Sequence, residues 1–430
     1  MTGWTDTDGR AVIYRGMNVS GDSKTNAGYL PNLDDTAYDL LPAYGITLAR
    51  YLVFWEAIEP TEGVYDDAYL DTVATDIQRL RDRGVDVMVD FHQDVWGEGF
   101  GFTGFPAWTC DQAEYDAFVP STVSWGLNYL TPQVEYCFDH FWASQPLQDA
   151  YAAMAAHTAD RLGDLVVGYD TMNEPSWGTS GQQALETGAY GDFQANVAGS
   201  LRAADPNAWI ALEPLSYTNM NGQTYLPFPA DTPVGGGGLL YAPHFYPSYA
   251  ESGAGWNGDF TDEGAWLNGL ADDADTRKVG LWLGEFGLFS DNGNEADYVH
   301  DVIDAVEARN GSTSYWSFDP GQVITGDGPG VLLPAWQRPY VHAVPGNILS
   351  IVPSDSGSVV TYAPTDPTLP VDIVVPAGAC ASLSIAAEPA MTGIGTMTPS
   401  PTVGTRVQLY GDPSNTSAGI ETLTLTCTPS

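Results

Sequence analysis

The sequence predicts a (β/α)8 (TIM) barrel, an α/β fold, followed by a small C-terminal antiparallel β-sandwich. Between Ala11 and about Asp319, eight β-rich runs alternate with amphipathic stretches, and most runs are apolar throughout, as in parallel strands buried on both faces. Eight such units in about 320 residues fit one barrel. After about Tyr340 the helical periodicity ends, and short runs rich in Val and Thr with turn residues follow. We therefore expect a catalytic barrel over residues 1–340 and an accessory sandwich over residues 341–430.

The elements are expected in the following order. The barrel strands are AVIYRGMN, ITLARYLVF, VDVMVDFHQD, LVVGYDTMNEP, WIALEP, LLYAPHFY, GLWLGEFG and TSYWSFD. Helices are expected over residues 69–83, 147–161, 190–204 and 295–309, because each stretch is amphipathic and ends in basic residues or Ala and Gly before the next strand. The sandwich strands lie within ILSIVPSDSGSVVTYAP, LPVDIVVPAGACASLSIA, TRVQLYG and IETLTLTCTPS.

The charge balance excludes several classes of protein. The chain has 430 residues, of which 55 are acidic and 14 basic, so its formal net charge is −41. Binding to nucleic acid or to anionic membranes requires clustered Lys and Arg, and Lys24 and Lys278 are the only lysines. No run approaches the ~18–20 apolar residues of a spanning helix. We expect neither a nucleic-acid partner nor an integral membrane segment.

The four cysteines form two local pairs, Cys110 with Cys137 and Cys380 with Cys427. An even count in an acidic, lysine-poor chain favours two disulfides and a secreted protein over the alternative of four buried thiols. Residues 2–10 are polar and lack the basic start and apolar core of a signal peptide, so export is inferred from the cysteines alone.

Polar side chains follow the points where the apolar strands end, and in a barrel these points converge on one pocket. The residues in question, in chain order, are Arg50, His92, Asp94, Asn173, Glu174, Glu213, His244, Tyr246, Glu285 and Trp316. The two histidines have an alternative role as hydrogen-bonded core residues. No HExxH helix and no dense Cys/His spacing accompanies them, so we expect no metal.

Glu174 and Glu285 are three βα units apart and should face each other across the mouth of the barrel. Two opposed carboxylates are what cleavage of a glycosidic bond requires, one as acid and one as nucleophile. The alternative, two buried structural glutamates, is costly where few basic residues can pair with them. Glu213 is a rival, but it lies only one strand from Glu174.

Several of these runs resemble glycoside hydrolase family 5, and more narrowly its endoglycoceramidase-like branch. The family motifs are matched by TMNEP (Thr171–Pro175), LGEFG (Leu283–Gly287), DFHQD (Asp90–Asp94), APHFY (Ala242–Tyr246) and LARYLVFWEAIEP (Leu48–Pro60). The narrower branch is suggested by RGMN followed by Lys24, and by HQDVWGEGFG and FPAW. The resemblance covers the barrel. It implies a retaining double displacement that releases an intact glycan from ceramide, and a C-terminal β-sandwich.

The resemblance also implies roles at the matching positions. Glu174 would be the acid/base and Glu285 the nucleophile, and Lys24 and Asp94 would hydrogen-bond the sugars before the scissile bond. The subsite of the reducing-end sugar would be lined by Arg50, His92, Asn173, His244, Tyr246 and Trp316. It implies no cofactor, and a glycosphingolipid as substrate; a monomer is expected.

Three questions stay open at this point. The aromatic residues Phe100, Phe102, Phe105 and Trp108 either form a small core above the barrel or line a groove for acyl chains. The aglycone could instead be a sterol, or the substrate a soluble β-glucan. A protein of another class, which binds glycolipid without cleaving it, would have no reason to keep two opposed carboxylates.

Overall fold

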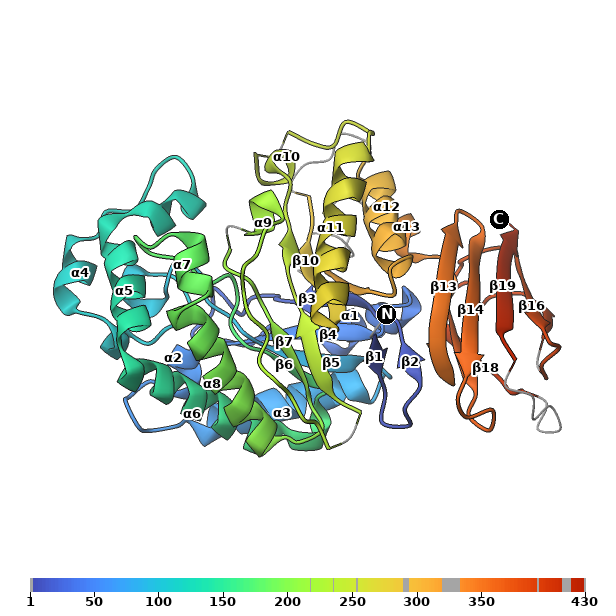
Figure 1. The fold of residues 1–430 in the computed structure, drawn as a ribbon, viewed down its shortest axis with the longest axis horizontal. Coiled ribbons are helices and arrows are strands. Elements are labelled where there is room, and N and C mark those ends of the chain that lie inside the picture. Colours follow the sequence, from blue (N-terminus) through green and yellow to red (C-terminus); the bar gives the residue numbers. More distant parts are fainter. Residues whose placement is uncertain are drawn as a thin grey trace.

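The computed structural model describes residues 3–216, 218–234, 236–252, 254–288, 294–318, 333–392, 394–411 and 419–428. Its larger part is a closed ring of parallel strands surrounded by helices (Figure 1). In ring order the strands are β3 (Arg15–Val19), β4 (Leu48–Val53), β5 (Asp86–Phe91), β6 (Gly168–Asp170), β7 (Trp209–Leu212), β8 (Gly238–Tyr241), β10 (Gly280–Phe286) and β11 (Ser312–Tyr315). Because β11 pairs with both β10 and β3, the ring is closed, and the predicted (β/α)8 barrel is confirmed.

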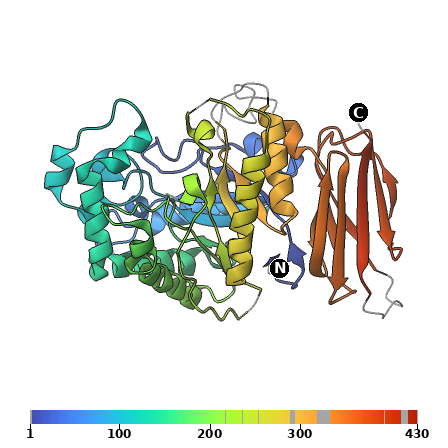
Figure 2. The ribbon, with the colours of Figure 1, turned by 45° about the horizontal axis from the view of Figure 1, so that its top comes forward.

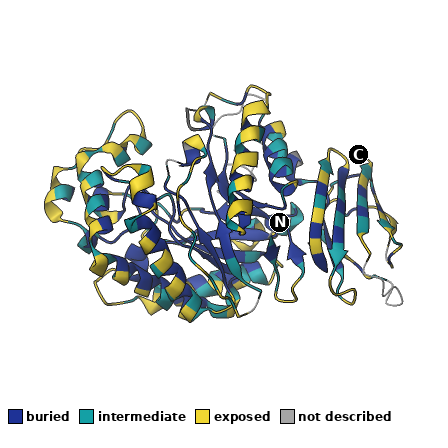
Figure 3. Ribbon diagram, viewed as in Figure 1, coloured by how far each residue is buried: buried dark blue, intermediate teal, exposed yellow. Residues whose placement is uncertain are grey.

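Helices cover the outside of the ring. The longer ones are α1 (Asp35–Ala43), α3 (Asp67–Arg81), α5 (Pro132–Ala143), α6 (Gln145–Leu162), α8 (Ala189–Ala204), α11 (Thr261–Arg277) and α12 (Glu295–Glu307). The four helices expected from periodicity correspond to α3, α6, α8 and α12. Each buries one face against the strands and exposes the other, as Figure 3 shows.

Shorter helices lie in the connections. They are α2 (Trp55–Ile58), α4 (Gln112–Ala117), α7 (Gln182–Glu186), α9 (Thr218–Asn221), α10 (Ser248–Ser252) and α13 (Leu333–Trp336), with 3₁₀ turns η1 (Glu98–Phe100), η2 (Ala107–Thr109), η3 (Trp125–Leu130) and η4 (Gly163–Leu165). The two-residue strand β9 (His244–Phe245) follows β8 and pairs with β10.

The prediction of the first barrel strand is wrong in one respect. Residues 11–18 were expected to form one barrel strand, but Ala11–Val12 is a separate strand, β2, paired with β1 (Trp4–Thr5) and with β12 (Tyr340–Val344) outside the barrel. The chain changes sheets between Ile13, whose N–H donates to His342 O at 2.8 Å, and Tyr14, whose carbonyl accepts from Thr313 in the barrel. Both sheets require apolar residues here, so the sequence shows no break.

The C-terminal strands form two five-stranded antiparallel sheets, one of them together with the N-terminal strands β1 and β2, as expected for a sandwich, and they lie at one side of the barrel (Figure 2). The sheet orders are β1-β2-β12-β15-β18 and β13-β14-β19-β16-β17. The strands are β13 (Gly346–Ser354), β14 (Gly357–Pro364), β15 (Val371–Val375), β16 (Ser382–Glu388), β17 (Gly395–Met397), β18 (Thr405–Leu409) and β19 (Glu421–Thr428). A division at 340/341 stays a prediction.

Both expected disulfides are present, Cys110–Cys137 and Cys380–Cys427. Among the helices of the described ranges, none has the length and apolar character needed to cross a bilayer.

Candidate active site

The interior of the barrel is apolar at one end and charged at the other. Side chains two residues apart on a strand share a face, so one strand can point an apolar side chain and then a charged one into the interior. On β4, Leu48 is followed by Arg50, and on β5, Met88 is followed by Asp90. Leu48 and Met88 pack with Trp4 and Trp282 in an apolar cluster at the amino ends of the strands. The polar side chains therefore collect at the carboxyl ends.

Arg50 is the centre of this polar layer and is fully buried. Its guanidinium lies within 3.0 Å of one oxygen each of Asp90, Asp170, Glu213 and Glu285, and it also donates to Asn18 Oδ1 and Asn173 Oδ1. Burial alone would lower the pKa of Arg50, but the surrounding carboxylates outweigh it and the pKa is raised well above its ordinary value. Arg50 is thus a fixed cation beneath the site.

Glu285 lies at the end of β10, and both of its carboxylate oxygens accept hydrogen bonds. Arg50 donates to Oε1 at 2.6 Å, and the Tyr246 hydroxyl donates to Oε2 at 2.9 Å. Burial raises the pKa of Glu285 above its ordinary value, and the positive charges of His244 and Arg50 limit that rise. Two donors aimed at one carboxylate favour its ionised form, which is the form that a nucleophile needs.

Glu174 follows β6 and is more exposed than Glu285. Its backbone has a positive φ of 41°, a conformation uncommon outside glycine, and its N–H donates to Glu213 Oε2 at 2.9 Å. Its side-chain Oε1 accepts from Asn219 Nδ2 at 2.8 Å and lies 2.9 Å from His244 Nδ1.

The structure brings the two predicted carboxylates together. One oxygen of Glu174, one of Glu285 and a ring nitrogen of His244 all lie within 4.8 Å of one another. Retaining glycosidases separate their two carboxyl groups by about 5–5.5 Å, and inverting ones by roughly 6.5–9.5 Å to admit a water. The close spacing fits the retaining geometry.

Lys24, Asp94 and Trp316 lie together beside this pair. Lys24 Nζ is 2.8 Å from Asp94 Oδ2 and 4.1 Å from the centre of the Trp316 ring, and His92 stacks on the same ring. Although burial acts the other way, Lys24 and His92 hold the pKa of Asp94 well below its usual range. This group offers charged hydrogen-bonding atoms and an aromatic face to a sugar.

Asp90 joins the two groups, because its Oδ1 contacts Arg50 at 3.0 Å and its Oδ2 contacts His92 Nδ1 at 2.7 Å. All ten residues proposed from the sequence therefore belong to one connected site. Asp90 was not among the predicted site residues, although its place two residues before His92 on a strand was a usable signal.

Two other partners were missed. Asn219 lies in α9 and holds the Glu174 side chain; no pattern in its TNMN stretch indicates this. Gln93 Nε2 donates to the backbone carbonyls of Asn173 and Glu174 at 2.9 Å, while Asn173 Nδ2 donates to Gln93 O. The Asn173 amide is thus turned partly toward the protein rather than only toward a substrate.

The aromatic loop is largely a small core. Phe105 is 1% exposed and stacks on Trp96 at 4.1 Å, and Phe100 is also buried, so neither can line an open acyl groove. Phe102 and Trp108 are partly exposed. The alternative of a groove along the whole loop is wrong, because the rings fill the space between the loop and α5.

Two triads of the described residues have ligand atoms close enough to hold a metal ion. They are Asp170, Glu213 and His244, and Glu174, His244 and Glu285. Arg50 and His244 already supply positive charge to these carboxylates. The expectation of a metal-free site stays a prediction.

A family model described as cellulase (glycosyl hydrolase family 5) matches residues 5–322. The chain belongs to glycosyl hydrolase family 5. The matched range contains every barrel strand and all ten residues of the predicted site. The family membership expected from the motifs is confirmed, and with it a glycoside hydrolase.

The chain is also similar to individual proteins of known name. Endoglycoceramidase I of Rhodococcus hoagii is 28% identical over 256 residues, which are 56% of this chain and 51% of that protein. A glucosylceramidase of Cryptococcus neoformans var. grubii is 28% identical over 252 residues, 44% of this chain and 34% of that protein. The matches thus span a third to a half of these relatives. The solved endo-glycoceramidase II from Rhodococcus sp., in complex with a cellobiose-like imidazole, is 27% identical with a TM-score of 0.87, covering 100% of both chains.

Proposed function

We propose that this family 5 chain is a retaining endo-β-glycosidase that cleaves the bond between an oligosaccharide and ceramide in glycosphingolipids. The observation that carries the proposal is the close pair of Glu174 and Glu285, the second held by Arg50 and Tyr246. A binding protein would not need this pair, since two close carboxylates repel each other and serve no role in recognition alone.

In the first step, Glu285 attacks the anomeric carbon of the innermost sugar and forms a covalent bond to it. The bond between that carbon and the lipid oxygen breaks, and Glu174 gives its proton to the departing oxygen. Arg50 and Tyr246 keep Glu285 oriented until the bond forms.

In the second step, Glu174 takes a proton from a water molecule, whose oxygen attacks the same carbon. The bond to Glu285 breaks, Glu285 regains its negative charge, and the glycan leaves with the anomeric configuration of the substrate. Glu174 ends the cycle protonated again, with a proton taken from the water in place of the one that it gave to the aglycone. Its greater exposure relative to Glu285 suits a group that must meet both aglycone and water.

The sugars preceding the scissile bond would bind on the side of Lys24, Asp94 and Trp316. Lys24 and Asp94 carry opposite charges that suit sugar hydroxyls, and the partly exposed Trp316 ring beside them adds an aromatic surface that suits C–H bonds. The Lys24–Asp94 pair presents both a donor and an acceptor.

The aglycone would leave toward an exposed apolar segment between the two cysteines of the first disulfide. Trp125 is 47% exposed and Leu130 54%, and Val119 and Val123 are more exposed still. Within the same segment, Tyr129 accepts a hydrogen bond from Gln93, whose amide also bonds the Glu174 carbonyl. The exposed Trp125 ring lies against Tyr129, with ring centres 6.3 Å apart, so two side chains, Tyr129 and Gln93, connect this apolar surface to the acid/base, and such a surface favours a lipid leaving group over a soluble glucan.

The names of related proteins support the same aglycone. The endoglycoceramidase I and endo-glycoceramidase II named above act on glycoceramides by name, and the latter was also solved as a ganglioside GM3 complex. The two disulfides support our further proposal that the protein is exported to an oxidising compartment.

The test compares release of free oligosaccharide from a glycosphingolipid with hydrolysis of a soluble β-glucan and of a steryl glucoside. We expect wild-type protein to prefer the glycosphingolipid. Preference for either other substrate would replace the ceramide assignment and leave the catalytic pair in place.

The catalytic pair is tested by Glu285→Ala and Glu174→Ala with activated aryl glycosides and azide. We expect both variants to lose turnover of the glycolipid by several orders of magnitude while unfolding at the wild-type temperature. Azide should give a glycosyl azide of inverted configuration with E285A and of retained configuration with E174A. The opposite pattern would exchange the two roles.

A further inference from the structure

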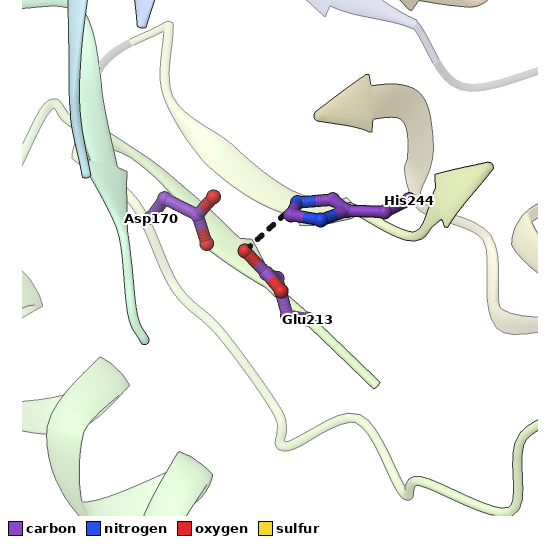
Figure 4. Close-up of side chains that lie close together, drawn as sticks. All are labelled: Asp170, Glu213 and His244. Carbon is purple, nitrogen blue, oxygen red and sulfur yellow. Dashed lines mark ion pairs between the residues drawn. The ribbon is translucent and has the colours of Figure 1, made fainter. Parts of the chain in front are cut away.

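Glu213 has no role in the mechanism above, yet it contacts three parts of the site. It is 1% exposed and lies just beyond the end of β7. Its Oε2 accepts the backbone N–H of Glu174 at 2.9 Å, and its Oε1 lies 3.0 Å from Arg50 and 3.2 Å from His244 Nε2. Figure 4 shows the His244 ring directed at this carboxylate.

His244 stands between two carboxylates. Its Nδ1 lies 2.9 Å from Glu174 Oε1 and its Nε2 lies 3.2 Å from Glu213 Oε1. The ring itself is fully buried. Burial would lower the pKa of His244, but the charges of Glu213 and Glu285 outweigh it and raise the pKa well above the ordinary value. The ring therefore favours the imidazolium form, whose Nδ1–H donates a hydrogen bond to Glu174 Oε1 and whose Nε2 forms an ion pair with Glu213 Oε1.

Asp170, the third residue in Figure 4, is a weaker candidate for the same role. It is fully buried, and its Oδ1 lacks a hydrogen-bond partner among the described residues. Burial, together with the neighbouring charge of Glu213, raises the pKa of Asp170 well above its usual range. Arg50 donates to one oxygen of Asp170, whereas both oxygens of Glu213 accept hydrogen bonds, one from Arg50 and one from the Glu174 N–H.

We propose that Glu213 is a positioning residue for Glu174: it fixes the Glu174 backbone directly and, through His244, orients and charges the donor that holds the Glu174 side chain. This inference rests on the proposed role of Glu174 as acid/base. As the aglycone departs, Glu174 loses its proton and becomes an anion, and the adjacent imidazolium stabilises that anion. The negative Glu213 keeps the imidazole protonated at the moment when this stabilisation is needed.

The proposal predicts that Glu213 matters most when the leaving group needs a proton. We would measure kcat/KM of Glu213→Gln for a series of aryl β-glycosides whose phenol leaving groups range from strongly to weakly acidic. For glycosides of weakly acidic phenols, kcat/KM should fall about ten- to a hundredfold relative to the wild type. This loss is a part of the ~10²–10⁴-fold that acid catalysis contributes. For the glycoside of strongly acidic dinitrophenol, kcat/KM should fall less than about threefold, because this leaving group departs without protonation. For the dinitrophenyl glycoside, any loss of kcat should come from the second step, in which Glu174 acts as base. Azide attacks without needing a base and should restore kcat.

An equal loss across the series would overturn the proposal, since it would show that Glu213 acts through Arg50 on the nucleophile or only on the fold. Wild-type rates across the series would overturn it as well. Because aryl glycosides contain no lipid, absence of glycosphingolipid cleavage by the wild type would count only against the proposed function.

The matched control is Glu186→Gln. Glu186 is also a buried carboxylate that accepts backbone N–H groups, from Leu215 and Tyr225, but it contacts neither His244 nor Glu174. We expect its leaving-group dependence to equal that of the wild type. Thermal unfolding checks each variant; should E213Q not fold, E213D is used, whose shorter carboxylate cannot reach both Glu174 and His244, and the same leaving-group dependence is expected.

Discussion

Glu56 is a buried acid outside the proposed catalytic pair, in the short helix α2 that follows β4. Its Oε1 accepts the N–H of Gly104 at 3.1 Å, and its own N–H donates to Gly104 O at 2.9 Å, so it ties the aromatic loop to the barrel. Burial raises the pKa of Glu56 to about 8 against the effect of the Gly104 hydrogen bond. Up to that pH the Glu56 carboxyl keeps its proton in the folded protein, whereas in the unfolded chain it releases the proton near pH 4.5.

The folded protein therefore binds the extra proton between about pH 4.5 and pH 8, and its stability falls as pH rises through this window. We expect Glu56→Gln, which stays neutral, to unfold at the wild-type temperature below pH 4.5 and to be more stable by up to a few kcal/mol above pH 8. Thermal unfolding of both proteins from pH 4 to 9 measures this. Parallel curves over the whole range would show that Glu56 is ionised in the folded protein.

At the scale of elements, the segment from α4 to α5 is distinctive because it exposes large apolar side chains while it is anchored at both ends. The Cys110–Cys137 disulfide closes it, and Asn128 caps its turn through bonds to Ser121 and Trp125. A segment held in this way can present apolar groups to solvent without collapsing onto the core.

Replacing Trp125 and Leu130 of η3 with Ser together should lower kcat/KM for a micellar glycosphingolipid about tenfold, because the lost apolar area no longer receives lipid. The rate on soluble aryl glycosides should not change. Ile420→Ser is the control, since Ile420 is 63% exposed but lies in the sandwich. Equal losses on both substrates would mean that the segment supports the fold of the site instead.

At the scale of the whole molecule, the net charge of −41 has a physical consequence. Excess charge of one sign destabilises the compact state through self-repulsion, and salt reduces the range of that repulsion from about 30 Å at 0.01 M to about 3 Å at 1 M. The buried pairs of Arg50 are shielded from salt by the protein and should be much less affected.

We therefore expect the unfolding temperature to rise by several degrees between 0.01 M and 1 M NaCl at pH 7. An equal increase in osmolality with glucose serves as the control for effects that do not depend on charge. A constant or falling unfolding temperature in NaCl would show that local ion pairs dominate over the net repulsion.

Particular residues show why much of the site could be predicted. Glu174, Glu285, Arg50 and His244 each end an apolar run, and the closure of a parallel barrel brings such positions together. Asn219 could not be found in this way, because it lies in a connection whose path depends on its surroundings. Tyr14 likewise gave no sign that the chain changes sheets before it.

The sequence by itself determined the barrel, most of the sandwich strands, both cysteine pairs and the two opposed carboxylates, because periodicity and strand-end polarity are local properties that the closed barrel makes unambiguous. Only the tertiary structure decided that Phe105 is buried, that Ala11–Val12 pairs with β12, and that the Glu213 carboxylate accepts the Glu174 N–H. These three features depend on contacts between residues distant in the chain. The local sequence pattern at each position is equally compatible with more than one state of burial or strand pairing.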